Sequence, residues 1–570
     1  MRILFLTHSF NSLTQRLFVA MREQGHDVSV EFDINDSVSL EAVELHRPDL
    51  IVAPFLKRAI PSSIWRNHVC LIVHPGIVGD RGPSSLDWAI LNDEPDWGVT
   101  VLQANAEMDA GDIWASAGFP MRAATKASLY RGEVADAAVA AVTLAVERFE
   151  AGGYEPTPLQ AVQSTSRGCV RPLVKQDDRR IDWAKDSSDV VLRKIRSADG
   201  FPGVADDNLG RRLFLYNASA APELQGEPGT LVATSGQAIG VATIDGGVWI
   251  GHLRDPDSAH PFKLPATRVL ADQCDLLPNI GDEQAGAWRD LWYEERDGVG
   301  YLHFPFYNGA MATHQCEALL DAYERATRAD TRVIVLCGGA EFWSNGMDLN
   351  QIEAADSAAD ESWRNINAID DLAAAIIRTT SHLTISALRG NAGAGGVFLA
   401  RAADRVWAHD GVILNPHYKD MGNLYGSEYW TYLLPRACGE ARAQAVTQAR
   451  LPVGVREAQE LGLVDQVLAS NRPAFDSALH DAASALTAAA DLPNLLARKA
   501  EQRAADERIR PLADYRQAEL ERMRLNFYGF DPSYHVARYN FVYKVAKSRT
   551  PLTIATHRRQ GAANRMRDVS

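Results

Sequence analysis

The sequence predicts a multidomain α/β protein, and three observations support this fold class. The chain has 570 residues, more than one hydrophobic core normally organises, so two to four domains are expected. Apolar runs alternate with helical stretches in both halves, which is typical of βαβ units around a mostly parallel sheet. A region of short strand-like runs lies between the halves and indicates a small β-rich domain.

The first predicted domain covers residues 1–155 and is Rossmann-like. Its strand-like runs are RILFLTH, HDVSVEF, DLIVAPF, CLIVHPG and GVTVLQA, with a helix from about Leu13 to Gln24 after the first run. Residues 7–12 follow the first strand without G-x-G-x-x-G spacing, which argues against a nicotinamide-binding domain. An Ala-rich helix from about Asp136 to Glu150 closes the domain, and Gly152-Gly153 marks a break.

Four further segments complete the predicted organisation. Residues 156–272 contain a predicted helix over Ser188–Ser197 and then runs such as RRLFLYNA and GVWIGHL, which favour a small β-rich domain. Residues 273–297 are expected to be a linker with some helix. A second α/β domain is predicted over residues 298–490. Residues 491–570 are rich in Arg and Glu, and we expect a helical extension that packs on the second domain.

Composition restricts the class of function. The 58 Lys and Arg residues and 73 Asp and Glu residues give a formal net charge of −15, which argues against nucleic-acid binding, because such proteins usually carry a basic face. No run of about 18 apolar residues is present, so we expect no membrane partner. The start, MRILFLTHSF, is too short for a signal-peptide core. The six cysteines lack metal-ligand spacing, so free thiols, no metal site and a cytoplasmic location are expected.

The densest motif of the first half runs from His74 as HPGIVGDRGPSSLDWAI and continues as GVTVLQANAEMDAGDIWAS. It resembles the N10-formyltetrahydrofolate-dependent formyltransferases, in which a strand ends in N-x-H and D-x-G-D follows. RIDW and KIRSADGFPG further along the chain resemble the C-terminal domain of methionyl-tRNA formyltransferases. The resemblance implies 10-formyltetrahydrofolate as the formyl donor.

The same resemblance assigns roles to two side chains. His74 would stabilise the oxyanion of a tetrahedral intermediate, and Asp109 would orient His74 or a water molecule. Taken singly, a His at a strand end and a D-A-G-D turn are also ordinary loop chemistry, but their spacing together favours a site. Ile72 departs from the family pattern, which has Asn there. Either another donor substitutes for that Asn, or this formyl acceptor needs less help.

Two segments of the second half form another motif: EFWSNGMDL at residues 341–349 and TISALRGNAGAGGVFLARAADRVWA at residues 384–408. They resemble the enoyl-CoA hydratase/isomerase (crotonase) family. This implies an oxyanion hole in which the backbone N–H groups of Met347 and Gly395 hold a CoA thioester carbonyl. Glycine suits this place because a backbone that touches the ligand cannot carry a Cβ, and the next N–H groups open a helix. The alternative is a Gly-rich turn that only packs a helix on a strand.

Two positions depart from the hydratase pattern. Phe398 and Tyr418 stand where hydratases carry their acid/base glutamates, so glutamate-catalysed addition of water is excluded. Glu428 lies ten residues after Tyr418, in GSEYW at the start of a predicted helix. It either complements the helix dipole as a first-turn acid or forms a new acid/base pair with Tyr418, and we favour the pair.

Together the two halves resemble the HypX (HoxX) hydrogenase maturation proteins. The resemblance implies formyl transfer from 10-formyltetrahydrofolate to coenzyme A, and then cleavage of formyl-CoA into CoA and the CO ligand of the [NiFe]-hydrogenase iron. It implies small-molecule substrates and hydrogenase maturation proteins as partners. Glu428 is favoured as the base and Tyr418 as the hydrogen-bond donor. Gln15 and Arg131 are candidate contacts for cofactor phosphates or the pterin, although a surface salt bridge explains Arg131 equally well.

Two alternatives remain at this point. One is a formyltransferase that acts on a charged tRNA or an amino-sugar nucleotide, with the second half as a scaffold. The other is a non-catalytic CoA- or folate-sensing assembly factor, for which Ile72 and Phe398 are the best evidence.

Overall fold

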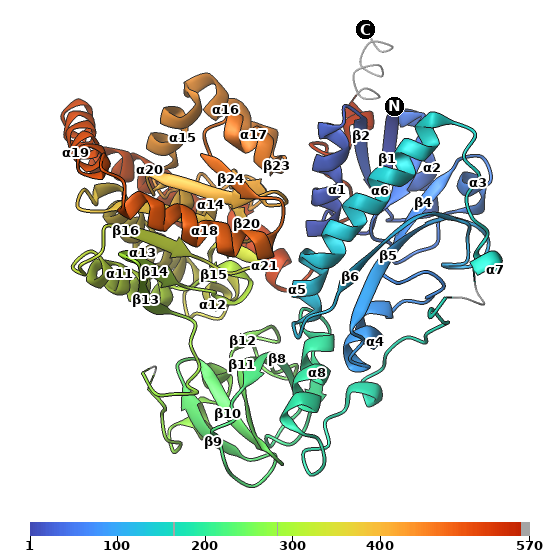
Figure 1. Cartoon of the computed structure of the whole chain (residues 1–570), viewed down its shortest axis with the longest axis horizontal. Coiled ribbons are helices and arrows are strands. Elements are labelled where there is room, and N and C mark those ends of the chain that lie inside the picture. Colours follow the sequence, from blue (N-terminus) through green and yellow to red (C-terminus); the bar gives the residue numbers. More distant parts are fainter. Residues whose placement is uncertain (163–165, 282, 560–570) are drawn as a thin grey trace. The chain divides into compact units, whose positions relative to one another are not determined.

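The structure is a computed structural model that describes residues 1–162, 166–281 and 283–559 (Figure 1). Backbone contacts divide the chain into two compact units. The first unit comprises Met1–Trp288 together with the segment from Lys547 onward, and the second comprises Arg289–Ala546. Each unit contains a six-stranded sheet with parallel strands and packed helices, which confirms the predicted α/β multidomain class.

The N-terminal part of the first unit is a single sheet with helices. Its elements are β1 (Arg2–Thr7), α1 (Ser12–Glu23), β2 (Asp27–Phe32), α2 (Asp36–His46), β3 (Leu50–Ala53), α3 (Ser62–Trp65), β4 (Cys70–His74), α4 (Ser85–Leu91), β5 (Asp96–Gln103), β6 (Ile113–Pro120), α5 (Lys126–Arg131) and α6 (Glu133–Ala151). The strand order is β2-β1-β3-β4-β5-β6. Strands β1 to β4 run parallel, and β5 and β6 add antiparallel. His74 therefore lies at the carboxyl end of a central strand, where parallel sheets place their sites.

An antiparallel sheet follows in the same unit. Its elements are α7 (Leu159–Val162), η1 (Asp177–Arg179), α8 (Ser188–Ala198), β7 (Val204–Asp206), β8 (Leu213–Ala220), β9 (Leu231–Ser235), β10 (Ala238–Thr243), β11 (Gly246–Arg254), β12 (Leu264–Pro265), α9 (Ala266–Val269) and α10 (Ala271–Cys274). The order is β7-β8-β11-β10-β9, and β12 pairs with β11. Helix α8 begins where Ser187 accepts a hydrogen bond from Val190 N. The predicted helix and the β-rich character of this region are confirmed.

The second unit has a main sheet and a smaller layer of short strands. Its elements are β13 (Trp292–Arg296), β14 (Val299–His303), η2 (Tyr307–Gly309), β15 (Ala310–Met311), α11 (Thr313–Ala326), β16 (Val333–Cys337), β17 (Phe342–Ser344), β18 (Gly346–Met347), α12 (Leu349–Glu353), α13 (Ala358–Arg378), β19 (Leu383–Leu388), β20 (Asn391–Gly393), α14 (Gly395–Arg401), β21 (Arg405–His409), β22 (Ile413–Asn415), α15 (Trp430–Cys438), α16 (Glu440–Ala449), β23 (Val453–Gly454), α17 (Val455–Glu460), β24 (Gln466–Ala469), α18 (Arg472–Thr487), α19 (Leu492–Ile509), α20 (Leu512–Tyr528) and α21 (Ser533–Val542). The main sheet has the order β13-β14-β16-β19-β21-β24, and the smaller layer has the order β17-β20-β22-β23.

The predicted linker at residues 273–297 is more ordered than expected. It contains β13, which forms an antiparallel pair with β14. The Trp292 ring stacks on His303 across this pair, with 4.7 Å between ring centroids. A cross-strand aromatic pair of this kind stabilises a hairpin. The strand was not predicted, because this pairing cannot be seen in the short run of residues 292–296 alone.

The predicted C-terminal extension divides between the two units. Helices α19 to α21 belong to the second unit, as expected, whereas residues 547–559 belong to the first. There Val30 N in β2 donates to Ile554 O at 3.0 Å, and the buried Glu31 carboxylate accepts from Arg558 Nε at 2.6 Å. Strand β2 is an edge strand that carries a buried carboxylate, so it needs both a backbone partner and a cation. Residues 547–559 supply both. Residues 560–570 of the extension lie outside the described residues.

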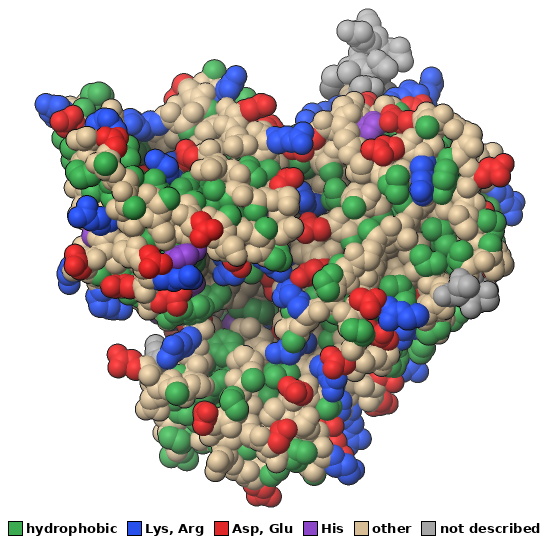
Figure 2. Space-filling view, in the orientation of Figure 1, with side chains coloured by type: hydrophobic (Ala, Val, Ile, Leu, Met, Phe, Trp, Pro, Cys, Tyr) green, Lys and Arg blue, Asp and Glu red, His purple; other side chains and the backbone are tan. Residues whose placement is uncertain are grey.

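Three further properties of the described residues bear on function. None of their helices is long and apolar enough to span a membrane. All six cysteines are free thiols, as predicted. On the face drawn in Figure 2, basic and acidic side chains are intermingled over both units.

Candidate active sites

The His74 ring in the first unit lies between two carboxylates. Its Nδ1 is 3.6 Å from Asp109 Oδ2, and its Nε2 is 3.4 Å from Asp80 Oδ1. Only 4% of the His74 side chain is exposed. A Cβ on Gly76 would overlap both the His74 ring and the Ser85 hydroxyl, so the His-Pro-Gly turn requires its glycine. The structure therefore brings the predicted His74 and Asp109 together.

The D-A-G-D turn positions the Asp109 carboxylate. Asp109 has a left-handed backbone with φ of +52°, and its Oδ2 accepts a hydrogen bond from Gly82 N at 3.1 Å. A Cβ on Gly111 would overlap the Gln103 carbonyl. The segment is thus a tight turn, as the alternative interpretation held, and it also aims a carboxylate at His74.

The sequence interpretation missed Asp80 and Arg171. Asp80 is buried and accepts hydrogen bonds from Ser85 Oγ and from Arg171 Nε, the latter at 2.6 Å. Arg171 is held over the site by a backbone hydrogen bond from its own N to Arg81 O at 2.8 Å. An aspartate inside the apolar and glycine-rich run IVGDRG was the available signal for Asp80, whereas nothing local indicated its distant arginine.

Three other predicted positions of this unit lie as follows. Ile72 pairs with Leu102 of β5 and packs in the hydrophobic core, so this position supplies no donor side chain. Gln15 lies on α1, where its Nε2 donates to Phe10 O at 3.0 Å. Arg131 is the last residue of α5. The role of Gln15 and Arg131 as cofactor contacts stays a prediction.

In the second unit, the predicted oxyanion positions lie on the two-stranded β15-β18 sheet and at the start of helix α14. Met347 ends β18, and Gly395 is the first residue of α14, after Ala394 with φ of +48°. A Cβ on Gly346 would lie 3.5 Å from Gly395 N, so the two backbones are adjacent. A Cβ on Gly395 itself would overlap the Glu428 carboxylate. This juxtaposition links the predicted oxyanion hole to Glu428.

Tyr418 and Glu428 form a buried hydrogen-bonded pair. The Tyr418 hydroxyl donates to Glu428 Oε2 at 2.6 Å. Burial, followed by the nearby Asp370 charge, raises the pKa of Glu428 to about 8. Burial and the Glu428 charge raise the pKa of Tyr418. Helix α15 starts at Trp430, so Glu428 precedes the first turn and the interpretation of it as a first-turn acid is wrong.

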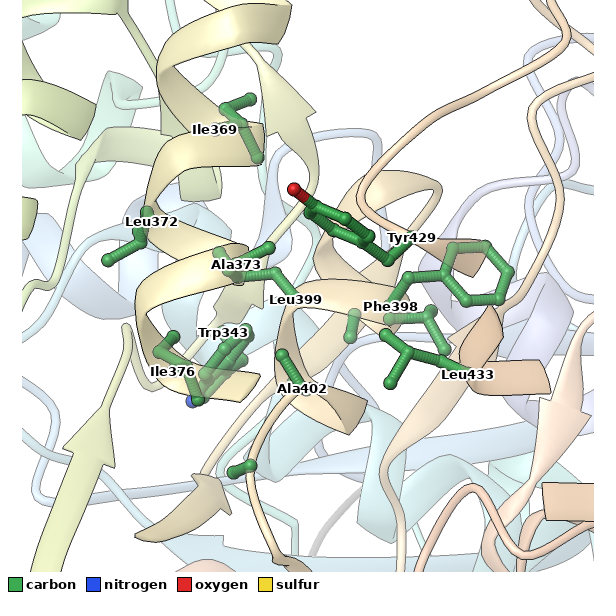
Figure 3. Close-up of a cluster of buried hydrophobic side chains, with 14 of the residues drawn as sticks. Trp343, Ile369, Leu372, Ala373, Ile376, Phe398, Leu399, Ala402, Tyr429 and Leu433 are labelled. Carbon is green, nitrogen blue, oxygen red and sulfur yellow. The ribbon is translucent and has the colours of Figure 1, made fainter. Parts of the chain in front are cut away.

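Aromatic rings pack beside Tyr418 of this pair. The Phe398 ring stacks on Tyr418 with 5.4 Å between centroids, and its centroid lies 6.4 Å from that of Trp430. In Figure 3, Phe398 of α14 lies among apolar side chains that include Leu433 of α15. A fully buried phenyl ring therefore fills the position where hydratases carry a glutamate, and it packs against the Tyr418 ring of the pair.

Comparison with known proteins decides the family. Over 567 residues the chain is 57% identical to the hydrogenase maturation factor HoxX of Bradyrhizobium diazoefficiens, and the alignment covers 99% of each protein. This chain belongs to the HoxX/HypX family of hydrogenase maturation factors. The crystal structure of HypX from Aquifex aeolicus in complex with tetrahydrofolic acid is 46% identical, with a TM-score of 0.94. That comparison covers 98% of this chain and 99% of the Aquifex chain.

The HoxX/HypX assignment agrees with matches to smaller families. The chain matches the formyl transferase family over residues 29–146, the formyl transferase C-terminal domain over 173–260, and the enoyl-CoA hydratase/isomerase family over 296–527. It is also 25% identical to a methionyl-tRNA formyltransferase of Geobacter sulfurreducens, over 44% of this chain and 77% of that protein. The motif resemblances in both halves are thereby confirmed.

Proposed function

We propose that this HoxX/HypX chain converts a folate-bound formyl group into CO for the iron of a [NiFe]-hydrogenase. In the first step the CoA thiol attacks the formyl carbon of 10-formyltetrahydrofolate. The C–N bond then breaks, and formyl-CoA and tetrahydrofolate form. In the second step formyl-CoA loses its formyl proton and its C–S bond breaks, which releases CO and CoA. Membership of a hydrogenase maturation family and the tetrahydrofolate complex of the Aquifex relative support this proposal.

The geometry of the first site suits acyl transfer. A tetrahedral intermediate develops negative charge on the formyl oxygen, which a nearby hydrogen-bond donor must stabilise. His74 supplies this donor, and its ring is held from both sides by Asp80 and Asp109. Gln15 and Arg131 would contact the pterin or the phosphates, because their amide and guanidinium groups offer the required donors.

One observation carries the second step: the buried 2.6 Å hydrogen bond between Tyr418 and Glu428 beside Gly395. Formyl-CoA has no α-carbon, so the enolate chemistry common in crotonases is impossible. The reaction instead needs a base for the formyl proton and a donor for the departing sulfur. Glu428 is the base, made stronger by its raised pKa, and Tyr418 is the donor.

The proposal places the reaction in the cytoplasm. Six free cysteines are typical of a reducing compartment. A substrate with a thiol group also needs a reducing compartment.

The test supplies 10-formyltetrahydrofolate and CoA while a haemoglobin trap records CO and mass spectrometry records acyl-CoA species. Glu428→Gln and Tyr418→Phe preserve volume but remove the base and the donor. We expect CO to fall on the order of 10²-fold to 10⁴-fold, while formyl-CoA, or formate from its hydrolysis, accumulates. Glu440→Gln, an exposed position on α16, is the matched control.

Two outcomes would contradict the proposal. Undiminished CO in both variants would remove the decarbonylation site. Folate consumption without any formyl-CoA or CO in the unmodified protein would favour a formyltransferase that uses a different acceptor.

A further inference from the structure

The backbone that carries Glu428 is strained. Glu428 and Tyr429 both have a φ of +59°, the left-handed region, although neither is glycine. Non-glycine residues in this region cost on the order of 1–3 kcal/mol each and persist only where the surroundings impose them. Something must therefore hold this segment in place.

Two buried carboxyl groups from other helices hold the segment. Asp370 Oδ1 on α13 accepts a hydrogen bond from Glu428 N at 2.8 Å. Glu519 on α20 accepts from Tyr429 N at 3.0 Å and from Thr431 N at 2.8 Å. Helix α15 has no capping side chain of its own at Tyr429, so Glu519 caps it from a distant part of the chain.

The Ser427 hydroxyl lies between these two carboxyl groups. Its Oγ is 2.8 Å from Asp370 Oδ2 and 3.2 Å from Glu519 Oε2. A hydroxyl has one hydrogen to donate. If Ser427 donates to one carboxylate, its contact with the other oxygen is favourable only when that second carboxyl carries a proton. The geometry therefore requires one proton on the Asp370–Glu519 pair.

Neither a neighbouring cation nor a metal site among the described residues takes the place of this proton. Arg516 Nε, the cation beside the cluster, is 3.9 Å from Asp370 Oδ2 and pairs more closely with Asp371 through Nη1. The described residues contain no group of three or more His, Cys, Asp or Glu side chains arranged to hold a metal ion. Titratable and charged groups from three helices and the loop before α15 surround Glu428: Cys316, Asp370, Tyr418, Tyr429, Arg516 and Glu519.

We propose that Asp370, Ser427 and Glu519 share one proton and act as positioning residues for Glu428. The cluster clamps the strained backbone and places one negative charge near the Glu428 carboxyl. This inference rests on the proposed role of Glu428 in decarbonylation. Its physical consequence is that Glu428 gives up its proton only near neutral or higher pH. Burial and neighbouring carboxyl charges raise the pKa of Asp370 to about 6 and that of Glu519 to about 8, which agrees with the shared proton.

Infrared difference spectroscopy of the full chain at pH 7 tests the shared proton. The measurements use the Glu428→Gln background, so that Glu428 itself contributes no carboxylic-acid band. We expect a C=O stretch of a protonated carboxyl that disappears when either D370N or E519Q is added. In each case the remaining carboxylate accepts the Ser427 hydrogen and ionises. Glu521→Gln, an exposed change two residues from Glu519 on α20, should keep the band.

A pH profile tests the positioning role. CO release from supplied formyl-CoA is measured for the unmodified chain and for the D370N/E519Q double variant. Removal of the negative charge should lower the pKa of Glu428 and move the rising limb to lower pH by about one pH unit. A role confined to folding would reduce the rate without moving the limb.

The outcomes are separable. Absence of the infrared band, or its survival in both D370N and E519Q, overturns the shared proton even if the double variant fails to fold. If the rising limb of the pH profile lies at the same pH in the D370N/E519Q variant, the positioning role is overturned. Full CO release by Glu428→Gln would instead remove the proposed function, and the infrared result would still be decided on its own.

Discussion

The first site surrounds its buried carboxylate Asp80 with donors, whereas the second site packs Glu428 beside two further buried carboxyl groups. Asp80 accepts from Arg171 and Ser85 and lies next to His74. In the second site Asp370, Glu428 and Glu519 have one arginine at their edge, 3.9 Å from the nearest carboxyl oxygen.

This difference matches the chemistry proposed for each site. Acyl transfer needs a fixed donor next to a developing oxyanion, so a carboxylate that orients a histidine serves best when it is itself paired. Removal of a formyl proton needs a base whose pKa lies near the working pH. Burial among other carboxyl groups raises the pKa of Glu428 to about 8, close to that condition.

The largest expected effect comes from breaking the ion pair of the first site. Arg171→Ala leaves Asp80 buried without its cation, which should lower the free energy of unfolding of the first unit by about 3–5 kcal/mol. Chemical denaturation checks this, with Arg167→Ala as the control. Arg167 pairs with Asp96 on the surface, with 53% of its side chain exposed, so its loss should cost about 0–1 kcal/mol. Equal losses would show that Asp80 does not depend on Arg171.

Variants of the two sites should also separate the two reactions. His74→Ala removes the proposed oxyanion donor, and CoA-dependent consumption of 10-formyltetrahydrofolate should fall by about 10²–10³-fold. Asp109→Asn should reduce it as well, because the carboxylate no longer orients His74. Both variants should still release CO from supplied formyl-CoA. Loss of that second activity in a folded His74→Ala variant would contradict the independence of the sites.

A smaller effect is expected from a substitution at Gly395, whose backbone belongs to the predicted oxyanion hole of the second site. A methyl group at Gly395 would overlap the Glu428 carboxylate, so Gly395→Ala should reduce CO release on the order of 10²-fold and weaken acyl-CoA binding. CO trapping and calorimetric titration with CoA measure the two effects. Gly118→Ala on β6 is the control, because its Cβ would make only an ordinary contact at 3.6 Å. Unchanged activity of Gly395→Ala would remove the oxyanion argument.

A further expected effect is a pH dependence of stability in the second unit. The pKa values of Glu428 and Glu519 are raised from 4.5 to about 8, so the folded unit binds more protons than the unfolded chain. Stability should therefore fall as pH rises from about 4.5 to about 8. Hydrogen exchange of amides in α13 and α15 measures it. Glu519→Gln should flatten the dependence, and Glu521→Gln should not. A slope identical in all three proteins would mean that the cluster does not titrate.

Local motifs were sufficient to predict several parts of both sites. His74 and Asp109, and likewise Tyr418 and Glu428, were assigned from motifs at strand ends and turns, and the structure places each pair in contact. Such residues can be predicted because a strand end or a tight turn positions a side chain through the backbone next to it. Phe398 was identified in the same way as a residue that excludes hydratase chemistry.

The sequence by itself determined the α/β class, the two motif-bearing halves and the motif residues that the structure brings together in each half. Tertiary structure alone decided the partners of the buried carboxyl groups. Arg171 meets Asp80 from 91 positions away, and Glu519 reaches Tyr429 from 90 positions away. Helix α20 is rich in charged residues and was expected to pack on the second domain, but nothing in its sequence indicated that Glu519 would be fully buried. Hydrophobic periodicity specifies which face of a helix packs, but it does not specify which polar group will lie opposite a buried carboxyl.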